Sequence, residues 1–146
     1  MALGAIYDIS ASGMNAQSLR MNTTASNIAN AQAVSGSAQD AYKARHPIFS
    51  AVLQGEQDAN NFGLGSQDDS SVAVRVMGIQ ESQEEAIARY QPSHPLAGKD
   101  GYVYMPNVNV VEEMTNMISA SRSFQINVEV MNSAKSMMQR LLTLGQ

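Results

Sequence analysis

The chain has 146 residues, a formal net charge of −4 and no cysteine. A chain of this length suits one modest domain, or a small domain that carries long arms, and the lack of cysteine excludes disulfides, thiolate metal sites and a cysteine nucleophile. Its nine basic residues are outnumbered by 13 acidic ones and form no basic patch along the sequence, which argues against a nucleic-acid partner.

The charged residues divide the chain into three parts. Residues 1–32 carry one acidic and one basic group, residues 33–107 carry nine acidic and five basic groups, and residues 108–146 carry three of each sign. The whole net charge therefore lies in the middle. We predict an α+β protein with a helical N-terminal arm over 1–32, a small β-rich middle domain over 33–107, and a long C-terminal helix over 108–146 that pairs with the N-terminal arm in a coiled-coil-like unit.

The N-terminal arm has the spacing of a helix but a weak helix composition. Apolar or small residues recur three and four positions apart along two neighbouring stripes, which favours a helix. Ser, Thr, Asn and Gly are frequent here, and a helix built from such poor helix formers needs packing to be stable. The candidate assembly residues on this arm are Ile6, Ile9, Gly13, Met14, Met21, Ser26, Asn27, Ile28 and Asn30.

The first 20 residues also bear on export. They have neither a basic start nor a continuous apolar run, so we expect no Sec-type signal peptide and no cleavage of one. No apolar run in the chain approaches the roughly 18–20 residues that span a bilayer, so we expect no membrane insertion.

The middle of the chain is expected to form a small, mostly antiparallel β element. Residues 71–79 and part of 43–53 alternate apolar and other side chains, which is the period of a half-buried strand. Residues 86–90 form a third short run, and residues 98–104 predict a turn followed by a strand. The polar, glycine-containing stretch 55–71 is expected to be a mobile loop.

The C-terminal segment carries the clearest pattern. From position 110 to 142, ten positions that alternate spacings of four and three hold eight apolar residues, which is typical of a coiled-coil seam. Pro106 and Asn107 mark its expected start, and no proline or glycine interrupts the segment from 107 to 144. The candidate assembly residues on the seam are Val110, Met114, Met117, Ser121, Phe124, Val128, Met131, Met138 and Leu142.

The methionine-rich stripe of this segment allows three interpretations: an internal core, a partner-binding face, or a membrane-surface helix. A membrane-surface helix needs a basic polar face, whereas the segment carries equal numbers of acidic and basic groups. The N-terminal arm is the one partner of similar length within the chain. Two paired helices leave apolar faces uncovered, so we expect other copies to complete the burial.

Residues with catalytic or metal-binding chemistry are sparse. His46 and His94 each precede a proline and lie 48 positions apart, which is no metal-ligand spacing. The adjacent acids at 68–69 and 84–85 are most simply explained as solvated side chains. The sequence contains no phosphate loop, dinucleotide-binding fingerprint or nucleophile elbow. We therefore expect no catalytic residue, no metal, no cofactor and no enzymatic activity.

Two segments resemble the flagellar rod and hook family of axial proteins. Met21–Ala25 followed by Ser26-Asn-Ile-Ala-Asn30 is similar to the N-terminal signature that rod, hook and hook-associated proteins share. The run from Met105 to Met138, closed by Thr143-Leu-Gly145, looks like the C-terminal segment of proximal rod subunits. The resemblance covers about the first 50 and the last 50 residues.

The resemblance implies a function and a set of partners. Such subunits are exported unfolded through the flagellar type III export apparatus and assemble into a hollow rod that crosses the periplasm within the basal body. Their paired terminal helices surround the export channel, the middle domain lies outside, and the rod transmits torque. The implied partners are further copies of the chain, the rod proteins FlgB, FlgF and FlgG, and FliE at the base.

Two alternatives remain at this point. The chain is also compatible with another secreted, needle-like coiled-coil subunit of a type III apparatus, which shares neutral helical arms and the lack of a signal peptide. A small module that acts on a cell-wall polymer is the second alternative, and its carboxylates would be Asp68, Asp69, Glu84 and Glu85.

Overall fold

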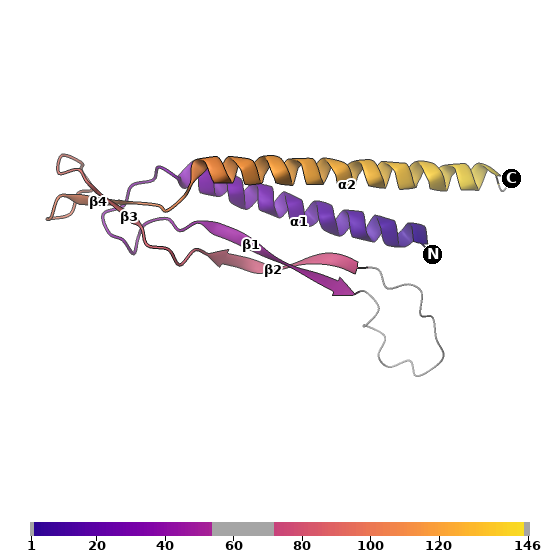
Figure 1. Cartoon of the computed structure of the whole chain (residues 1–146), viewed down its shortest axis with the longest axis horizontal. Coiled ribbons are helices and arrows are strands. Elements are labelled where there is room, and N and C mark those ends of the chain that lie inside the picture. The colour runs from indigo at the N-terminus through magenta and orange to yellow at the C-terminus, as the bar shows by residue number, and fades with distance from the viewer. Residues whose placement is uncertain (1, 54–71, 145–146) are drawn as a thin grey trace, which may run out of the picture. The chain divides into compact units, whose positions relative to one another are not determined.

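The structure is a computed structural model that describes residues 2–53 and 72–144. Within these residues the elements follow in the order α1 (Ala2–Asn30), β1 (Arg45–Leu53), β2 (Val72–Glu81), β3 (Ile87–Tyr90), β4 (Tyr102–Met105) and α2 (Val110–Leu144) (Figure 1). The predicted α+β class, with long terminal helices and small sheets between them, is confirmed. The loop predicted over 55–71 lies outside the described residues.

The contacts of the chain define two compact units, and each unit contains a part of both helices. The first unit comprises the described residues of 1–19, 49–77 and 120–146, and the second comprises 20–48 and 78–119. The boundary between the units therefore cuts across both helices. Each unit is described by itself below.

Helix α2 begins at Val110, three residues after Asn107, so it starts later than Pro106 and Asn107 predict. The side-chain oxygen of Asn109 accepts hydrogen bonds from the N–H groups of Val111 at 3.1 Å and Glu112 at 3.4 Å, and the Asn109 carbonyl accepts the first helical bond from Glu113 at 3.0 Å. Asn109 is therefore the N-cap. Asn107 instead donates its side-chain N–H to the Glu84 carboxylate.

Strands β3 and β4 form an antiparallel hairpin in the second unit. Their register pairs Ile87 with Met105 and Tyr90 with Tyr102. The predicted turn lies between them, where Gly101 has a φ of 75°; a Cβ at this position would lie 2.8 Å from the Tyr90 ring, so only glycine fits. Tyr90 and Tyr102 meet edge to face with their centroids 5.3 Å apart.

Strands β1 and β2 form the second two-stranded sheet among the described residues, and they run in opposite directions (Figure 1). In the second unit the pairing continues beyond β2, where the Ser82 N–H donates to the Ala44 carbonyl at 2.8 Å. The Arg45 guanidinium lies 3.1 Å from a Glu81 carboxylate oxygen across the strands. In the first unit the Val74 N–H donates to the Ser12 hydroxyl of α1 at 3.2 Å.

The buried core of the described residues consists almost entirely of small side chains. Its hydrophobic members are Ala16, Ala31, Ala41, Ala44, Val103, Ala120 and Ala134. Val103 and Asn27 are the largest side chains that are fully buried in this part of the chain. Burial of small side chains contributes little hydrophobic free energy per residue, so most of the large apolar side chains remain available for contacts outside the chain.

Candidate assembly site

In the first unit, small residues bring α1 and α2 close together. Gly13 faces the side chain of Asn127, and a Cβ at Gly13 would lie 2.8 Å from Asn127 Nδ2. Ser10 and Ala16 of α1 and Ala120 and Ala134 of α2 are all buried. Small side chains at a helix–helix contact let the two backbones approach closely.

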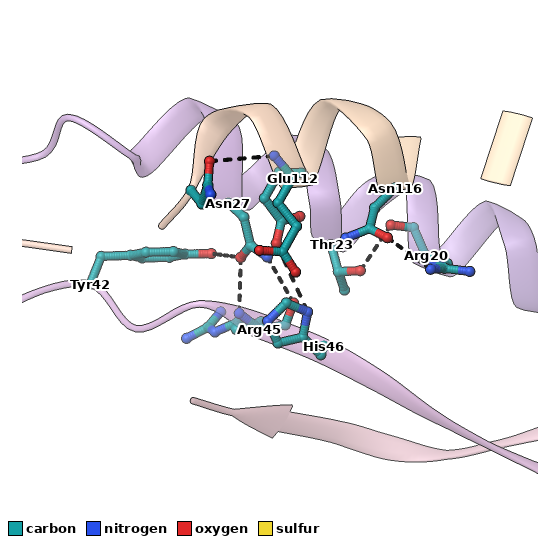
Figure 2. A network of polar contacts seen from close by, with 10 residues as sticks. Arg20, Thr23, Asn27, Tyr42, Arg45, His46, Glu112 and Asn116 are labelled. Carbon is teal, nitrogen blue, oxygen red and sulfur yellow. Dashed lines mark hydrogen bonds and ion pairs between the residues drawn. The ribbon is translucent and has the colours of Figure 1, made fainter. Parts of the chain in front are cut away.

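In the second unit the same two helices meet through polar groups. The Arg20 guanidinium donates to the side-chain oxygen of Asn116 at 3.0 Å, as Figure 2 shows. Glu113 is buried in the first turn of α2, and its carboxylate lies 4.0 Å from the His46 imidazole of β1. The hydrogen bond between Arg20 and Asn116 therefore joins the two helices in this unit.

The most buried positions of α2 recur every seven residues. Glu113, Ala120 and Ala134 are buried, and Asn127, which completes the series, is half-buried against Gly13. These positions lie next to the predicted seam but do not coincide with it. The apolar pattern selects large side chains, whereas the contact with α1 uses small and polar ones.

The predicted seam residues consequently divide between two environments. Met114, Met138 and Leu142 are exposed. The others are half-buried: Val110, Met117, Ser121, Phe124, Val128 and Met131. On α1, Asn27 is buried, Ile9 and Ser26 are exposed, and the remaining candidates are half-buried: Ile6, Gly13, Met14, Met21, Ile28 and Asn30.

A second group of large apolar side chains on α2 was not singled out from the sequence. In the first unit Ile126, Val130, Met137 and Leu141 are exposed at 59%, 43%, 49% and 60%. In the second unit Val111 and Ile118 are exposed as well. The spacing of four, seven and four from position 126 to position 141 is a helical signal that the sequence contains. The apolar stripe that begins at Val110 is longer, and it is the stronger pattern on the same helix.

Asn27 of the Ser26–Asn30 signature is the centre of a hydrogen-bond network in the second unit (Figure 2). Its side-chain Nδ2 donates to the Arg45 carbonyl at 2.9 Å. Its Oδ1 accepts from the Arg45 N–H and from the Tyr42 hydroxyl, each at 2.9 Å. This fully buried amide therefore fixes the start of β1 to the last turns of α1.

Tyr42, whose hydroxyl bonds to Asn27, is half-buried beside Arg45. Burial raises the pKa of its hydroxyl above the ordinary value of about 10, because the phenolate loses hydration. The Arg45 guanidinium, 5.8 Å from the centroid of the Tyr42 ring, acts in the opposite direction.

The described residues that the sequence offers for catalysis or metal binding form local hydrogen bonds or are exposed. His94 accepts a hydrogen bond from the Leu96 N–H at 3.2 Å within a turn, and Glu85 is exposed. Asp68 and Asp69 lie outside the described residues. Across residues 2–53 and 72–144, no three His, Asp or Glu side chains are grouped so that they could hold a metal ion.

Neither α1 nor α2 contains a stretch that is both long and apolar enough to cross a bilayer.

Models of known protein families match both ends of the chain. Residues 8–36 match the family model of the flagella basal body rod protein, and residues 99–144 match that of the flagellar basal body rod FlgEFG protein C-terminal region. The flagellar basal-body rod protein FlgC of Salmonella typhimurium is 45% identical over 146 residues, with both chains covered completely.

Similar relatives occur in other bacteria. FlgC of Escherichia coli O157:H7 is 46% identical over 146 residues, again with both chains covered completely. FlgC of Borreliella burgdorferi is 34% identical over 151 residues, which cover all of this chain and 99% of the relative. The chain belongs to the family of the flagellar basal-body rod protein FlgC.

Proposed function

We propose that this chain is a structural subunit of the flagellar rod and that it polymerises through its two terminal helices. The observation that carries the proposal is the exposed apolar surface of α2, on which Ile126, Val130, Met137 and Leu141 keep between 43% and 60% of their surface accessible. Extended apolar patches on a soluble chain mark interaction sites. The family assignment supports the rod, and it does not favour the alternative of a needle-like subunit.

The energy for assembly comes from covering this surface. Full burial of one large apolar side chain contributes about 1.5–3 kcal/mol relative to full exposure, and these four side chains are about half exposed. Covering them with a neighbouring copy therefore contributes several kcal/mol for each contact. A contact that joins two different surfaces repeats without closing, and it generates a helical array of subunits.

The candidate assembly residues fall into two roles in this proposal. The half-buried seam residues, among them Phe124, Val128 and Met131, become fully covered when neighbouring copies pack against α2. The exposed residues Met114, Met138 and Leu142 contact other copies directly. The three-part division at 32 and 107 then describes the assembled state, in which the paired ends form the wall of a hollow shaft and residues 33–107 lie outside.

The place of the chain within the flagellum, its neighbours there and its route of export are also proposals. The shaft surrounds the export channel, transmits torque and spans the periplasm. Its neighbours are further copies of the chain together with FlgB, FlgF, FlgG and FliE. The chain reaches this place through the flagellar type III apparatus, and it acts as a structural subunit rather than as an enzyme. The names of its relatives as rod proteins and the many poor helix formers of α1, which suit a chain exported unfolded, support this setting.

Immunoelectron microscopy of purified basal bodies tests the proposal. An epitope tag inserted at the turn between β3 and β4, near Lys99, marks the middle domain without touching either helix. We expect label along the rod in cells that produce the tagged chain and swim normally. Cells with an untagged chain provide the control for background label. Swimming cells whose tagged chain is absent from the basal body would overturn the proposal.

A further inference from the structure

Methionine supplies all the sulfur of this chain, because the sequence contains ten methionines and no cysteine. Four described methionines keep 67%, 54%, 49% and 37% of their surface accessible: Met77, Met114, Met137 and Met138. The other described methionines are half-buried: Met14, Met21, Met105, Met117 and Met131. Since the oxidation of a thioether depends on its exposure, an oxidant dissolved in water reaches the sulfur of the first four side chains more readily.

Two of these methionines lie within the apolar end of α2 in the first unit. Positions 130, 137 and 141 are seven and four residues apart, so Val130, Met137 and Leu141 share one side of the helix. Met138 and Leu142 are four residues apart on the adjoining side, and all five side chains are exposed. Each thioether is therefore part of the apolar surface through which we propose that copies of the chain assemble.

Hydrogen peroxide oxidises a thioether by transferring one oxygen atom to it. The O–O bond of the peroxide breaks, the sulfur bonds to one oxygen and loses two electrons, and the other oxygen leaves as water. The product, methionine sulfoxide, is polar, whereas the thioether is apolar. Burial of the sulfoxide oxygen without a hydrogen-bond donor is unfavourable. Oxidation therefore converts a side chain that favours burial into one that opposes it.

We propose that Met137 and Met138 form an oxidation site that blocks assembly, because a sulfoxide at either position opposes the covering of this end of α2 by another copy. The inference rests on the proposed function, since it requires α2 to pack against other copies. Unassembled chain is the form that peroxide modifies, because assembly covers both sulfur atoms. Methionine sulfoxide reductases, which return the two electrons to the sulfur, would restore the chain.

Peptide mass spectrometry of the purified full chain after exposure to dilute hydrogen peroxide tests the modification. We expect the sulfoxide to form several-fold faster at Met137 and Met138 than at Met131, which is half-buried on the same helix. Met77 is the internal reference for a fully reactive position, because it is the most exposed of the four. Equal rates at Met131, Met137 and Met138 would overturn the inference.

The Met137→Gln variant tests the consequence for assembly, because glutamine approximates the size and polarity of methionine sulfoxide. We expect about a tenfold loss of chain recovered in purified basal bodies, the effect of one unpaired polar group in a contact. Met138→Gln is a second, independent variant with the same expected result. Met77→Gln is the matched control, because it makes the same change at an exposed methionine of β2 and should be incorporated like the natural chain.

Thermal unfolding of the three purified variants checks that each one folds, and we expect melting temperatures close to that of the natural chain because the altered side chains are exposed. Normal incorporation of folded Met137→Gln and Met138→Gln, or an equal loss for Met77→Gln, would overturn the inference and leave the proposed rod function intact. Absence of the natural chain from basal bodies would instead contradict the rod function itself.

Discussion

The side chain of Asn27 bonds to the backbone of Arg45 at both its N–H and its carbonyl group, with both distances at 2.9 Å. The amide thus completes the hydrogen bonding of a residue that begins β1, in the way that a neighbouring strand would. A third bond comes from the Tyr42 hydroxyl. The helix and the strand are separated by the chain segment from Ala31 to Ala44, so this buried side chain fixes how that segment returns to α1.

Replacing Asn27 with Asp tests this role. The change keeps the shape of the side chain and the oxygen that accepts from Arg45 and Tyr42. It removes the donor to the Arg45 carbonyl and places a carboxylate in a fully buried site. We expect a loss of about 1–3 kcal/mol in the free energy of unfolding, the usual cost of leaving a buried polar group without its partner. Urea unfolding of the purified chain measures it.

Asn22→Asp is the control for the Asn27 variant. Asn22 lies on the same helix and is exposed, so the same chemical change there should alter stability by no more than about 0.5 kcal/mol. Similar losses in the two variants would show that the cost arises from the helix itself and not from the contact with Arg45.

Gly13 provides a test of the close helix contact. Alanine is the better helix former by about 1 kcal/mol, but its Cβ at position 13 would lie 2.8 Å from Asn127 Nδ2. We expect Gly13→Ala to gain less stability than Gly4→Ala, where no atom lies within 4 Å of an added Cβ. Adding Asn127→Ala to the Gly13→Ala variant should restore the stability that the clash with Asn127 removes. Chemical unfolding of the natural chain, Gly13→Ala, Asn127→Ala and the double variant measures the coupling between the two positions. Additive effects would contradict the contact.

Much of the fold could be predicted because it depends on short patterns. The alternation in 71–79 and the turn before Tyr102 are local signals, and β2 and the β3–β4 hairpin follow them. The start of α2 was missed although its signal is also local. Asn109 and Glu112 have the spacing of a capping box. The proline at 106 is the stronger helix-start signal in the sequence, so the predicted start lies next to it.

The details of the site were less predictable, for two physical reasons. The Ser26–Asn30 signature identifies Asn27, but its partner is the backbone of a residue 18 positions away, which no side-chain pattern reveals. The contact between α1 and α2 uses positions beside the predicted seam, because hydrophobic periodicity reports every apolar surface of a helix, including surfaces that meet other molecules. Ala120 and Ala134 carry a weaker apolar signal than Met114 or Leu142, yet only the alanines are buried within the chain.

Tyr42 predicts a specific loss of stability at alkaline pH. Its pKa is raised in the folded chain, so above about pH 10 the unfolded chain releases a proton that the folded chain still holds. Stability that is fully present below pH 10 therefore falls as the pH rises toward the folded pKa. Tyr42→Phe should be less stable than the natural chain by about 0.5–1.5 kcal/mol at pH 8, because it lacks the bond to Asn27, and this difference should shrink by pH 11.

Urea unfolding between pH 8 and pH 11 measures the difference between the natural chain and the Tyr42→Phe variant. Tyr90→Phe is the matched control, because Tyr90 is exposed on the hairpin and the variant retains the Tyr42 contribution. A difference between the natural chain and Tyr42→Phe that stays constant over this range would contradict the assignment.

Charge substitutions on α2 separate the contact within the chain from the contacts between copies. Val128→Asp and Met131→Asp place a charge at half-buried positions, so we expect each to destabilise the monomer by about 1–3 kcal/mol and to block rod incorporation. Ile126→Asp and Leu141→Asp alter exposed positions, so the monomer should change by no more than about 0.5 kcal/mol while rods still fail to form. Asn132→Asp adds the same charge at an exposed polar position and should leave both properties unchanged. Thermal unfolding of the purified chains and electron microscopy of basal bodies measure the two effects; normal rods from Ile126→Asp and Leu141→Asp would show that the exposed apolar surface stays uncovered in the assembly.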